Sequence, residues 1–193
     1  AYRKFDPVNP TDVSIASSLG AADKKVLGNV FPTYFGAFNS NMAYKNFDLG
    51  FMFRFSGGNK INNLTRRELL SQGFNNNGTE ILGRWQSIDN PGDGWTPRLR
   101  DDRETIININ QASSRFVEKG DYIKLDNITL GYNLPKSVLD KVGLEKFRLF
   151  VQGQNLLIIT DYKGLDPEME VLGNDYNGTP RSRIFSICLN VGF

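Results

Sequence analysis

The chain of 193 residues contains no histidine and one cysteine, Cys188. Without imidazole the sequence lacks the commonest general base and the commonest metal ligand, together with every Ser-His or Cys-His nucleophile arrangement. A single cysteine forms neither an internal disulfide nor a cysteine-based zinc site. Most hydrolase mechanisms therefore lack their central residue here.

The sequence also lacks a strong charge and a long apolar run. Lys and Arg number 23 against 21 Asp and Glu, so no field of one sign favours nucleic acid as a partner. No apolar run approaches the ~18 residues of a membrane helix, and the first residues lack the pattern of a signal peptide. A helical membrane protein is excluded. The strands of a membrane barrel need only about 9 to 11 alternating residues, so a barrel remains open.

Alternation of period two is present. In residues 47–56 every second residue is large and apolar, which predicts a strand with one apolar face. Residues 184–193 repeat this design, and their apolar face consists of Phe185, Ile187, Leu189, Val191 and Phe193. Residues 34–44, 122–133 and 147–160 predict three further strands. The alternation in 122–133 changes phase near Asp126-Asn127, which predicts a β-bulge.

The connections between these five strands differ in length. Lys45-Asn46 predicts a tight hairpin, and residues 134–146 hold a helical turn with Pro135 at its first position and Gly143 at its end. Residues 57–120 and 161–183 are long loops, and residues 1–33 form a loop or strand that leads into the sheet. Short turns at one end with long loops at the other are typical of an outer-membrane barrel. A soluble sandwich with one binding rim is the alternative.

The longest loop predicts a short helix capped by Thr65, through a Thr65-to-Glu68 capping box and with Gly73 as its stop. Arg84, Trp85 and Trp95 in this loop are candidate ligand-binding residues, because aromatic faces and polar groups suit a sugar or peptide. Alternatively, the two tryptophans pack the loop against itself or anchor it at the membrane interface.

Carboxylates gather in residues 161–183, and Asp166 and Glu168 are the candidate ligand-binding residues among them. An oxygen-rich loop can bind calcium, but the spacing does not match an EF-hand, so a solvated acidic loop is favoured. In the strands, polar side chains alternate with the apolar ones. If the apolar face meets lipid, these side chains face the barrel lumen: Arg54, Arg148, Gln152 and Gln154.

Several stretches resemble one family in the same order along the chain. Residues 122–135, YIKLDNITLGYNLP, resemble a stretch that reads roughly SYLRLKNITLGYTLP in SusC/RagA-type TonB-dependent transporters. Residues 154–168, QNLLIITDYKGLDPE, resemble the family's GQNLFTFTKYSGYDPE. Residues 23–32, residues 44–49 and the strand that follows Pro180-Arg181 also match.

The resemblance implies an all-β fold: the C-terminal antiparallel strands of a transmembrane barrel of the 22-strand class, with long extracellular loops that carry short helices. It implies a bacterial outer-membrane receptor, not an enzyme, that imports glycans or peptides with TonB-supplied energy and has no cofactor. The expected partners are the rest of the barrel and its plug, a SusD-like surface lipoprotein, the TonB complex through a missing N-terminal region, the ligand and outer-membrane lipid, but not nucleic acid. The terminal apolar strand resembles an outer-membrane assembly signal.

On this interpretation the chain is a fragment that holds about the last five strands. Two alternatives remain open. One is a soluble β-rich carbohydrate-binding module, and the other is a passive barrel or adhesin without energy coupling.

Overall fold

The structure is a computed structural model, and it describes all residues except 1, 4–12, 15–19, 72–75, 100–112 and 170–171. The chain forms two compact units, of which one comprises Ala1–Gly28 and Asn62–Val117 and the other comprises Asn29–Ile61 and Glu118–Phe193. Within the described ranges, no helix is both long enough and apolar enough to cross a bilayer.

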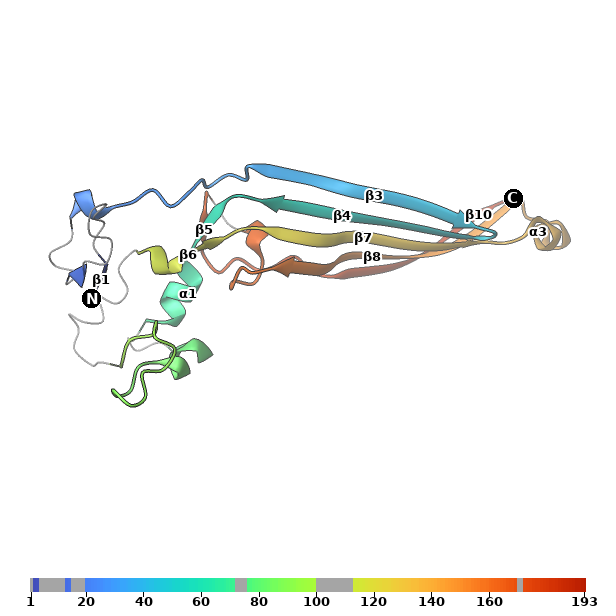
Figure 1. The fold of residues 1–193 in the computed structure, drawn as a ribbon. Coiled ribbons are helices and arrows are strands. Elements are labelled where there is room, and N and C mark those ends of the chain that lie inside the picture. The colour runs from blue at the N-terminus through green and yellow to red at the C-terminus, as the bar shows by residue number, and fades with distance from the viewer. Residues whose placement is uncertain (1, 4–12, 15–19, 72–75, 100–112, 170–171) are drawn as a thin grey trace. The chain divides into compact units, whose positions relative to one another are not determined.

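The second unit is built on a five-stranded antiparallel sheet with the order β10-β8-β7-β4-β3 (Figure 1). Its strands are β3 (Tyr34–Tyr44), β4 (Phe47–Gly57), β7 (Tyr122–Asn133), β8 (Lys146–Thr160) and β10 (Ile184–Gly192). The predicted all-β antiparallel fold is confirmed. The described strands form an open sheet whose two edges are β3 and β10.

Apolar side chains form rows across the sheet because the register aligns the apolar face of each strand with that of its neighbour. One row runs through all five strands: Met42, Leu49, Leu130, Val151 and Ile187. A second row lies nearer the hairpin turns and is rich in aromatic rings: Tyr44, Phe47, Tyr132, Leu149 and Leu189. Cross-strand pairs of this kind each contribute roughly 0.2 to 1 kcal/mol relative to alanine pairs.

The predicted bulge is present in β7. Leu125 pairs with Phe53 and Asn127 pairs with Met52, so Asp126 is an extra residue relative to β4. The pairing of β7 with β8 shifts at the same place, where Asn155 adopts a left-handed conformation with φ 54°. The extra residue restores the alternation, since Leu125 and Ile128 both remain on the apolar face.

Short connections lie at one end of the sheet. Lys45 and Asn46 form the two-residue turn between β3 and β4. Helix α3 (Lys136–Val142) joins β7 to β8, with Pro135 as its N-cap and Gly143 ending it at φ 68°, as expected for a helix stop. The C-terminus lies at this end too, since the Glu145 amide donates to the Gly192 carbonyl (Figure 1).

The long segments leave the sheet at its other end, and they contain strands that the sequence does not predict. The strands β5 (Lys60–Asn63), β6 (Val117–Lys119) and β9 (Asn174–Asp175) make a small sheet with the order β6-β5-β9. The 3₁₀ helix η5 (Pro167–Met169) lies between β8 and β9. These strands have two to four residues, which is too short for alternation to be visible in the sequence.

The first unit holds the strand pair β1 (Tyr2–Arg3) and β2 (Val13–Ser14), the 3₁₀ helices η2 (Ala21–Asp23), η3 (Thr79–Gly83) and η4 (Ser114–Phe116), and helix α1 (Leu64–Leu69). The predicted helix exists, but the expected cap is wrong. Asn63 caps α1 by accepting the Arg66 amide at 2.7 Å, so Thr65 lies inside the helix. Gly73, the expected stop, lies outside the described residues.

Arg66 organises the described part of the longest loop. Its guanidinium forms a bidentate ion pair with Glu80, at 2.5 and 2.8 Å, and donates to the Arg115 carbonyl at 3.1 Å. The guanidinium carbons of Arg66 and Arg115 lie 5.9 and 5.4 Å from the ring centre of Phe116, which is fully buried. These contacts join three segments of the loop into one folded body.

Candidate functional site

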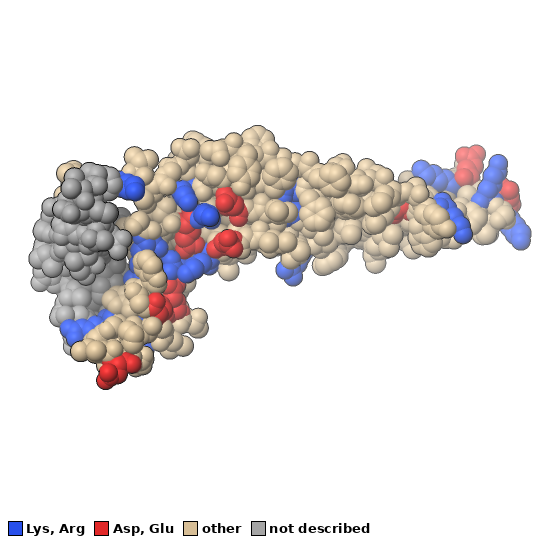
Figure 2. Space-filling model, in the orientation of Figure 1, with Lys and Arg blue, Asp and Glu red and all other residues tan. Residues whose placement is uncertain are grey.

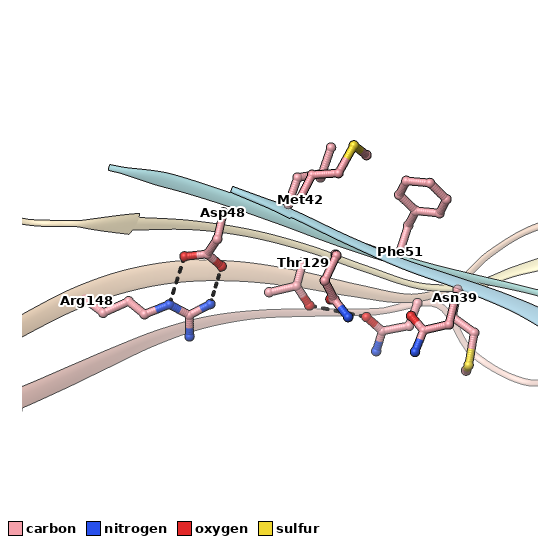
Figure 3. A pocket seen from close by; sticks show the side chains of 11 residues that line it. Asn39, Met42, Asp48, Phe51, Thr129 and Arg148 are labelled. Carbon is pink, nitrogen blue, oxygen red and sulfur yellow. Dashed lines mark hydrogen bonds and ion pairs between the residues drawn. The ribbon is translucent and has the colours of Figure 1, made fainter. Parts of the chain in front are cut away.

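The polar face of the five-stranded sheet carries the first group of candidate residues. Figure 3 shows its two sides: Met42 and Phe51 project from one, while Asp48, Thr129 and Arg148 lie on the other. The register places all four side chains predicted to face the lumen on this polar face: Arg54 opposite Lys124, Arg148 opposite Asn133, Gln152 opposite Thr129 and Gln154 opposite Asn127. That this face meets a lumen stays a prediction.

Asp48 and Arg148 form an ion pair that reaches over a whole strand. Asp48 lies on β4 and Arg148 on β8, and β7 runs between them at about 4.8 Å from each. The Arg148 guanidinium donates to the carboxylate at 2.5 and 3.1 Å, and Asn133 adds a hydrogen bond of 3.0 Å (Figure 3). Gly131 on β7 makes room, because a Cβ there would lie 2.5 Å from both Asp48 oxygens.

A second cluster, which we call the Glu168 cluster, fixes the loop after β8 to the same face. Its members are Glu168, Tyr122, Lys124, Arg54, Asp126 and Arg181. The Glu168 carboxylate accepts hydrogen bonds from Lys124 at 2.5 Å, Tyr122 at 2.8 Å and Arg54 at 3.0 Å. Arg54 also pairs with Asp126 at 3.1 Å, and Arg181 lies 3.7 Å from Glu168.

The charge of Glu168 is maintained by these donors. Burial by itself would raise the pKa of Glu168, but the hydrogen bonds from Lys124 and Tyr122 and the charges of Lys124 and Arg54 outweigh burial and lower it. Glu168 is therefore ionised at neutral pH. Because only 7% of the Glu168 side chain and 4% of the Lys124 side chain is exposed, their ion pair is buried.

Asp166 and Glu168 were expected to bind ligand or to lie in solvent. Asp166 accepts a hydrogen bond from the Glu168 amide at 2.9 Å and so shapes the turn. The Glu168 carboxylate is already paired with the side chains of Lys124 and Arg54. Among the described residues, no group of three acidic, cysteine or histidine side chains is placed to hold a metal ion. Ligand binding by Asp166 and Glu168 stays a prediction, as does calcium binding by the loop.

Asp93 shapes the tryptophan-bearing loop. Its carboxylate accepts the backbone amides of Trp95 and Thr96 at 2.8 and 2.6 Å and the Thr96 hydroxyl at 2.7 Å. These bonds, led by that from the Thr96 amide, lower the pKa of Asp93 despite its desolvation. The Trp85 amide in turn donates to the Thr96 carbonyl at 2.8 Å, which brings the two tryptophans together.

Trp85 and Trp95 line a hollow of about 460 Å³ together with Pro91 and Pro97. Trp95 is 77% exposed, so its ring is available to a ligand or partner, whereas Trp85 is half-buried. Arg84, the third residue predicted here, lies beside the hollow but does not line it; its amide ends η3. Ligand binding by all three stays a prediction.

The opposite face of the sheet is apolar and open. Phe185, Ile187 and Leu189 of β10 are 75%, 79% and 58% exposed, and they share this face with Val191, while Phe193 follows the strand. Figure 2 shows a flank of the sheet whose middle stretch has few charged side chains, while charged side chains gather beside α3 and near the opposite end of the strands. A contiguous face of exposed apolar side chains is typical of a membrane or partner contact.

Several residues of these clusters were not predicted as site residues. Lys124, Tyr122 and Arg181 look like ordinary polar positions in sequence, and Asp48 and Gly131 acquire their role only when β4, β7 and β8 are aligned. The one local signal was the change of phase at Asp126, which lies inside the Glu168 cluster.

The relatives found among known proteins are TonB-dependent receptors. The chain is 37% identical over 193 residues to a TonB-dependent receptor of Formosa agariphila. The aligned region covers 94% of this chain and 18% of that receptor. It is 32% identical over 158 residues to the TonB-dependent receptor SusC of Bacteroides thetaiotaomicron, covering 80% of this chain and 14% of that one. No family model matches the chain.

Solved structures show the same fold. The RagAB peptide importer in its open-open state superposes with a TM-score of 0.80 at 23% identity, over 97% of this chain and 20% of that one. In its closed-closed state the TM-score is 0.76 over 92% of this chain. The chain thus spans less than one fifth of the length of the Formosa agariphila receptor and of SusC.

Proposed function

The chain belongs to the TonB-dependent receptor family, whose members lie in the bacterial outer membrane. We propose that it forms part of a receptor that takes up nutrients across that membrane. The observation that carries the proposal is the sorting of side chains on the five-stranded sheet. One face is apolar in every strand, and the other carries the ion pairs of Asp48 and of Glu168.

This sorting suits a barrel wall and not a soluble module. A soluble sheet of this kind would cover its apolar face with a second layer, whereas Phe185 and Ile187 are more than 70% exposed. Charged groups on a lipid-facing strand cost roughly 2 to 4 kcal/mol near the bilayer centre, so their confinement to the other face supports a lumen there.

The relatives support a proposal about the partners of this receptor. One structural neighbour is named the RagAB peptide importer, and we propose a surface lipoprotein of the SusD type as the partner of this receptor. We also propose that a plug occupies the lumen against the polar face and that the TonB complex supplies the energy. The open edges of β3 and β10 would then pair with further strands of the same barrel.

The transported ligand is a glycan or a peptide, and the hollow between Trp85 and Trp95 is the proposed contact in this chain. Aromatic faces bind both the apolar faces of sugars and peptide side chains. The exposed indole of Trp95 and the polar backbone around Asp93 supply both kinds of contact.

The test is uptake by cells. A strain that lacks the full-length receptor gene is compared with one that carries it, using a labelled oligosaccharide and a labelled oligopeptide, with and without collapse of the proton gradient. The proposal expects receptor-dependent uptake of one of the two that stops when the gradient collapses. Uptake that continues without the gradient would indicate a passive barrel, and surface binding without uptake would indicate an adhesin.

The ligand contact has its own matched control. Trp95→Ala should weaken ligand binding about tenfold, because stacking and hydrophobic contacts of an indole are worth roughly 1 to 2 kcal/mol. Ile88→Ala removes a side chain that is 89% exposed in the same loop but does not line the hollow, and it should leave affinity unchanged. Equal losses in both variants would refute the assignment of the hollow.

A further inference from the structure

A second hollow, of about 430 Å³, lies on the polar face and shares Arg54, Asp126 and Arg181 with the Glu168 cluster. It is lined by side chains from three strands and from the segment that precedes β10. The polar ones are Arg54, Asp126, Asn127, Gln154, Asn155 and Arg181. Cross-strand pairing of Asn127 with Gln154 sets two amides side by side on its floor.

The two arginines of this hollow have unused hydrogen-bonding capacity. Arg54 uses Nη2 for both of its ion pairs, and its Nε is buried without a hydrogen-bond partner. Arg181 is 47% exposed, and its one ion-pair contact in the described part of the chain is Glu168 at 3.7 Å. The Glu168 oxygen that faces Arg181 already accepts from Lys124 at 2.5 Å.

The amides add further donors. The Gln154 side chain lines the hollow and has no hydrogen-bond partner among the residues that the structure describes. Asn155 uses its side-chain nitrogen for the Ser182 carbonyl at 3.1 Å, which fixes the segment that carries Arg181 beside the bulge. The acidic groups nearby, Asp126 and Glu168, are each held by cations, so their charge opposes an incoming anion only weakly.

We propose that this hollow binds a carboxylate of the transported ligand, with the Arg181 guanidinium as its principal contact and the Gln154 side-chain amide as a further donor. A guanidinium matches the shape of a carboxylate and binds it with two parallel hydrogen bonds. The inference rests on the proposed function and narrows it, because it selects acidic ligands among glycans and peptides.

A carboxylate has two sources in such ligands: the C-terminus or an acidic side chain of a peptide, and the uronic acid of a glycan. The experiment separates them with two matched probe pairs. N-acetyl-tetra-alanine is compared with its C-terminal amide, and tri-galacturonate is compared with its methyl ester. Binding to the purified full-length receptor is measured by titration calorimetry.

We expect one acidic probe to bind roughly tenfold to hundredfold more tightly than its neutral counterpart, the range for a hydrogen bond to a charged group. Arg181→Gln should remove this preference. Arg183→Gln makes the same change of charge two residues away, at an exposed side chain that does not line the hollow, and should retain the preference.

Three results would overturn the inference. The first is equal affinity for both members of each probe pair, and the second is no measurable binding of either acid. The third is a preference that survives Arg181→Gln; a loss of thermal stability in the same variant would then assign Arg181 to a contact with the plug. Uptake of neutral ligand by the same receptor would show that the proposed function stands in each case.

Discussion

Replacing Glu168 by glutamine would test how the loop after β8 is held on the sheet. Glutamine keeps the shape of the side chain and one acceptor oxygen, but it removes the negative charge that contacts Lys124, Arg54 and Arg181. Lys124 would then carry a positive charge in a place where 4% of its side chain is exposed. The perturbation is therefore an unpaired buried charge.

The magnitude follows from burial. Removing one partner of a buried ion pair costs about 3 to 5 kcal/mol, whereas partly exposed pairs such as that with Arg181 contribute about 0 to 1 kcal/mol. Relaxation of Lys124 toward water would reduce the cost, so we expect about 3 kcal/mol. Glu168→Gln therefore lowers the free energy needed to open the loop by this amount, which raises the population of the open loop roughly hundredfold.

Hydrogen–deuterium exchange of the full-length receptor would measure this opening. The amides of Tyr162 and Lys163 are the reporters, since they donate to the Thr160 hydroxyl and to Glu118. Their exchange should accelerate in Glu168→Gln and remain unchanged in Glu145→Gln, which alters an exposed side chain at the other end of the sheet. Unchanged exchange in Glu168→Gln would refute the role of the Glu168 cluster.

The contribution of Glu168 to the stability of the receptor should be lost at low pH. The pKa of Glu168 is lowered from its ordinary value of 4.5, so its contribution to stability is complete above that value and is lost as pH falls through the lower pKa of the folded state. The stability difference between wild type and Glu168→Gln should therefore be constant from neutral pH down to about 5 and shrink below 4.5. A difference that disappears between pH 7 and 6 would contradict this assignment.

Three further predictions concern other contacts. Gly131→Ala should cost about 1 to 2 kcal/mol in receptor stability, because its Cβ displaces Asp48 from Arg148; Gly20→Ala, where a Cβ meets nothing, is the control for chemical denaturation. Ile187→Lys places a charge on the apolar face and should make insertion of the receptor into vesicles less favourable by about 2 to 4 kcal/mol, the cost near the bilayer centre. Ser186→Lys places the same charge on the polar face and should leave insertion unchanged. Asp93→Ala should accelerate amide exchange at Trp95 and Thr96 at least tenfold, and protection equal to wild type would contradict its role in the turn.

The main strands could be predicted because their alternation extends over nine to fifteen residues, enough to separate period two from chance. The range 34–44 and the end of β7 at Asn133 coincide with the observed bounds. The cap of α1 was misplaced because Thr65 and Glu68 satisfy a capping pattern, while Asn63 belongs to a strand that is too short to recognise.

The candidate site could be predicted only in part. The polar positions Arg54 and Arg148 follow from alternation, but their partners do not, because Arg54 is 114 residues from Glu168 and Arg148 is 100 residues from Asp48. A carboxylate such as Glu168 in a loop is more often solvated than buried. Its burial depends on Lys124 and Tyr122, which reach it only after β7 has paired with β4.

The bulge at Asp126 connects local sequence to the site. With an unbroken alternation, Lys124 and Asn127 would lie on opposite faces of β7, since they are three residues apart. The extra residue puts both on the polar face, so Lys124 reaches Glu168 while Asn127 pairs with Gln154 on the floor of the neighbouring hollow. A bulge interrupts the ladder and leaves a residue unpaired, and here that residue, Asp126, holds Arg54 at 3.1 Å. The change of phase in the sequence is thus the local signature of a polar cluster whose other members are distant along the chain.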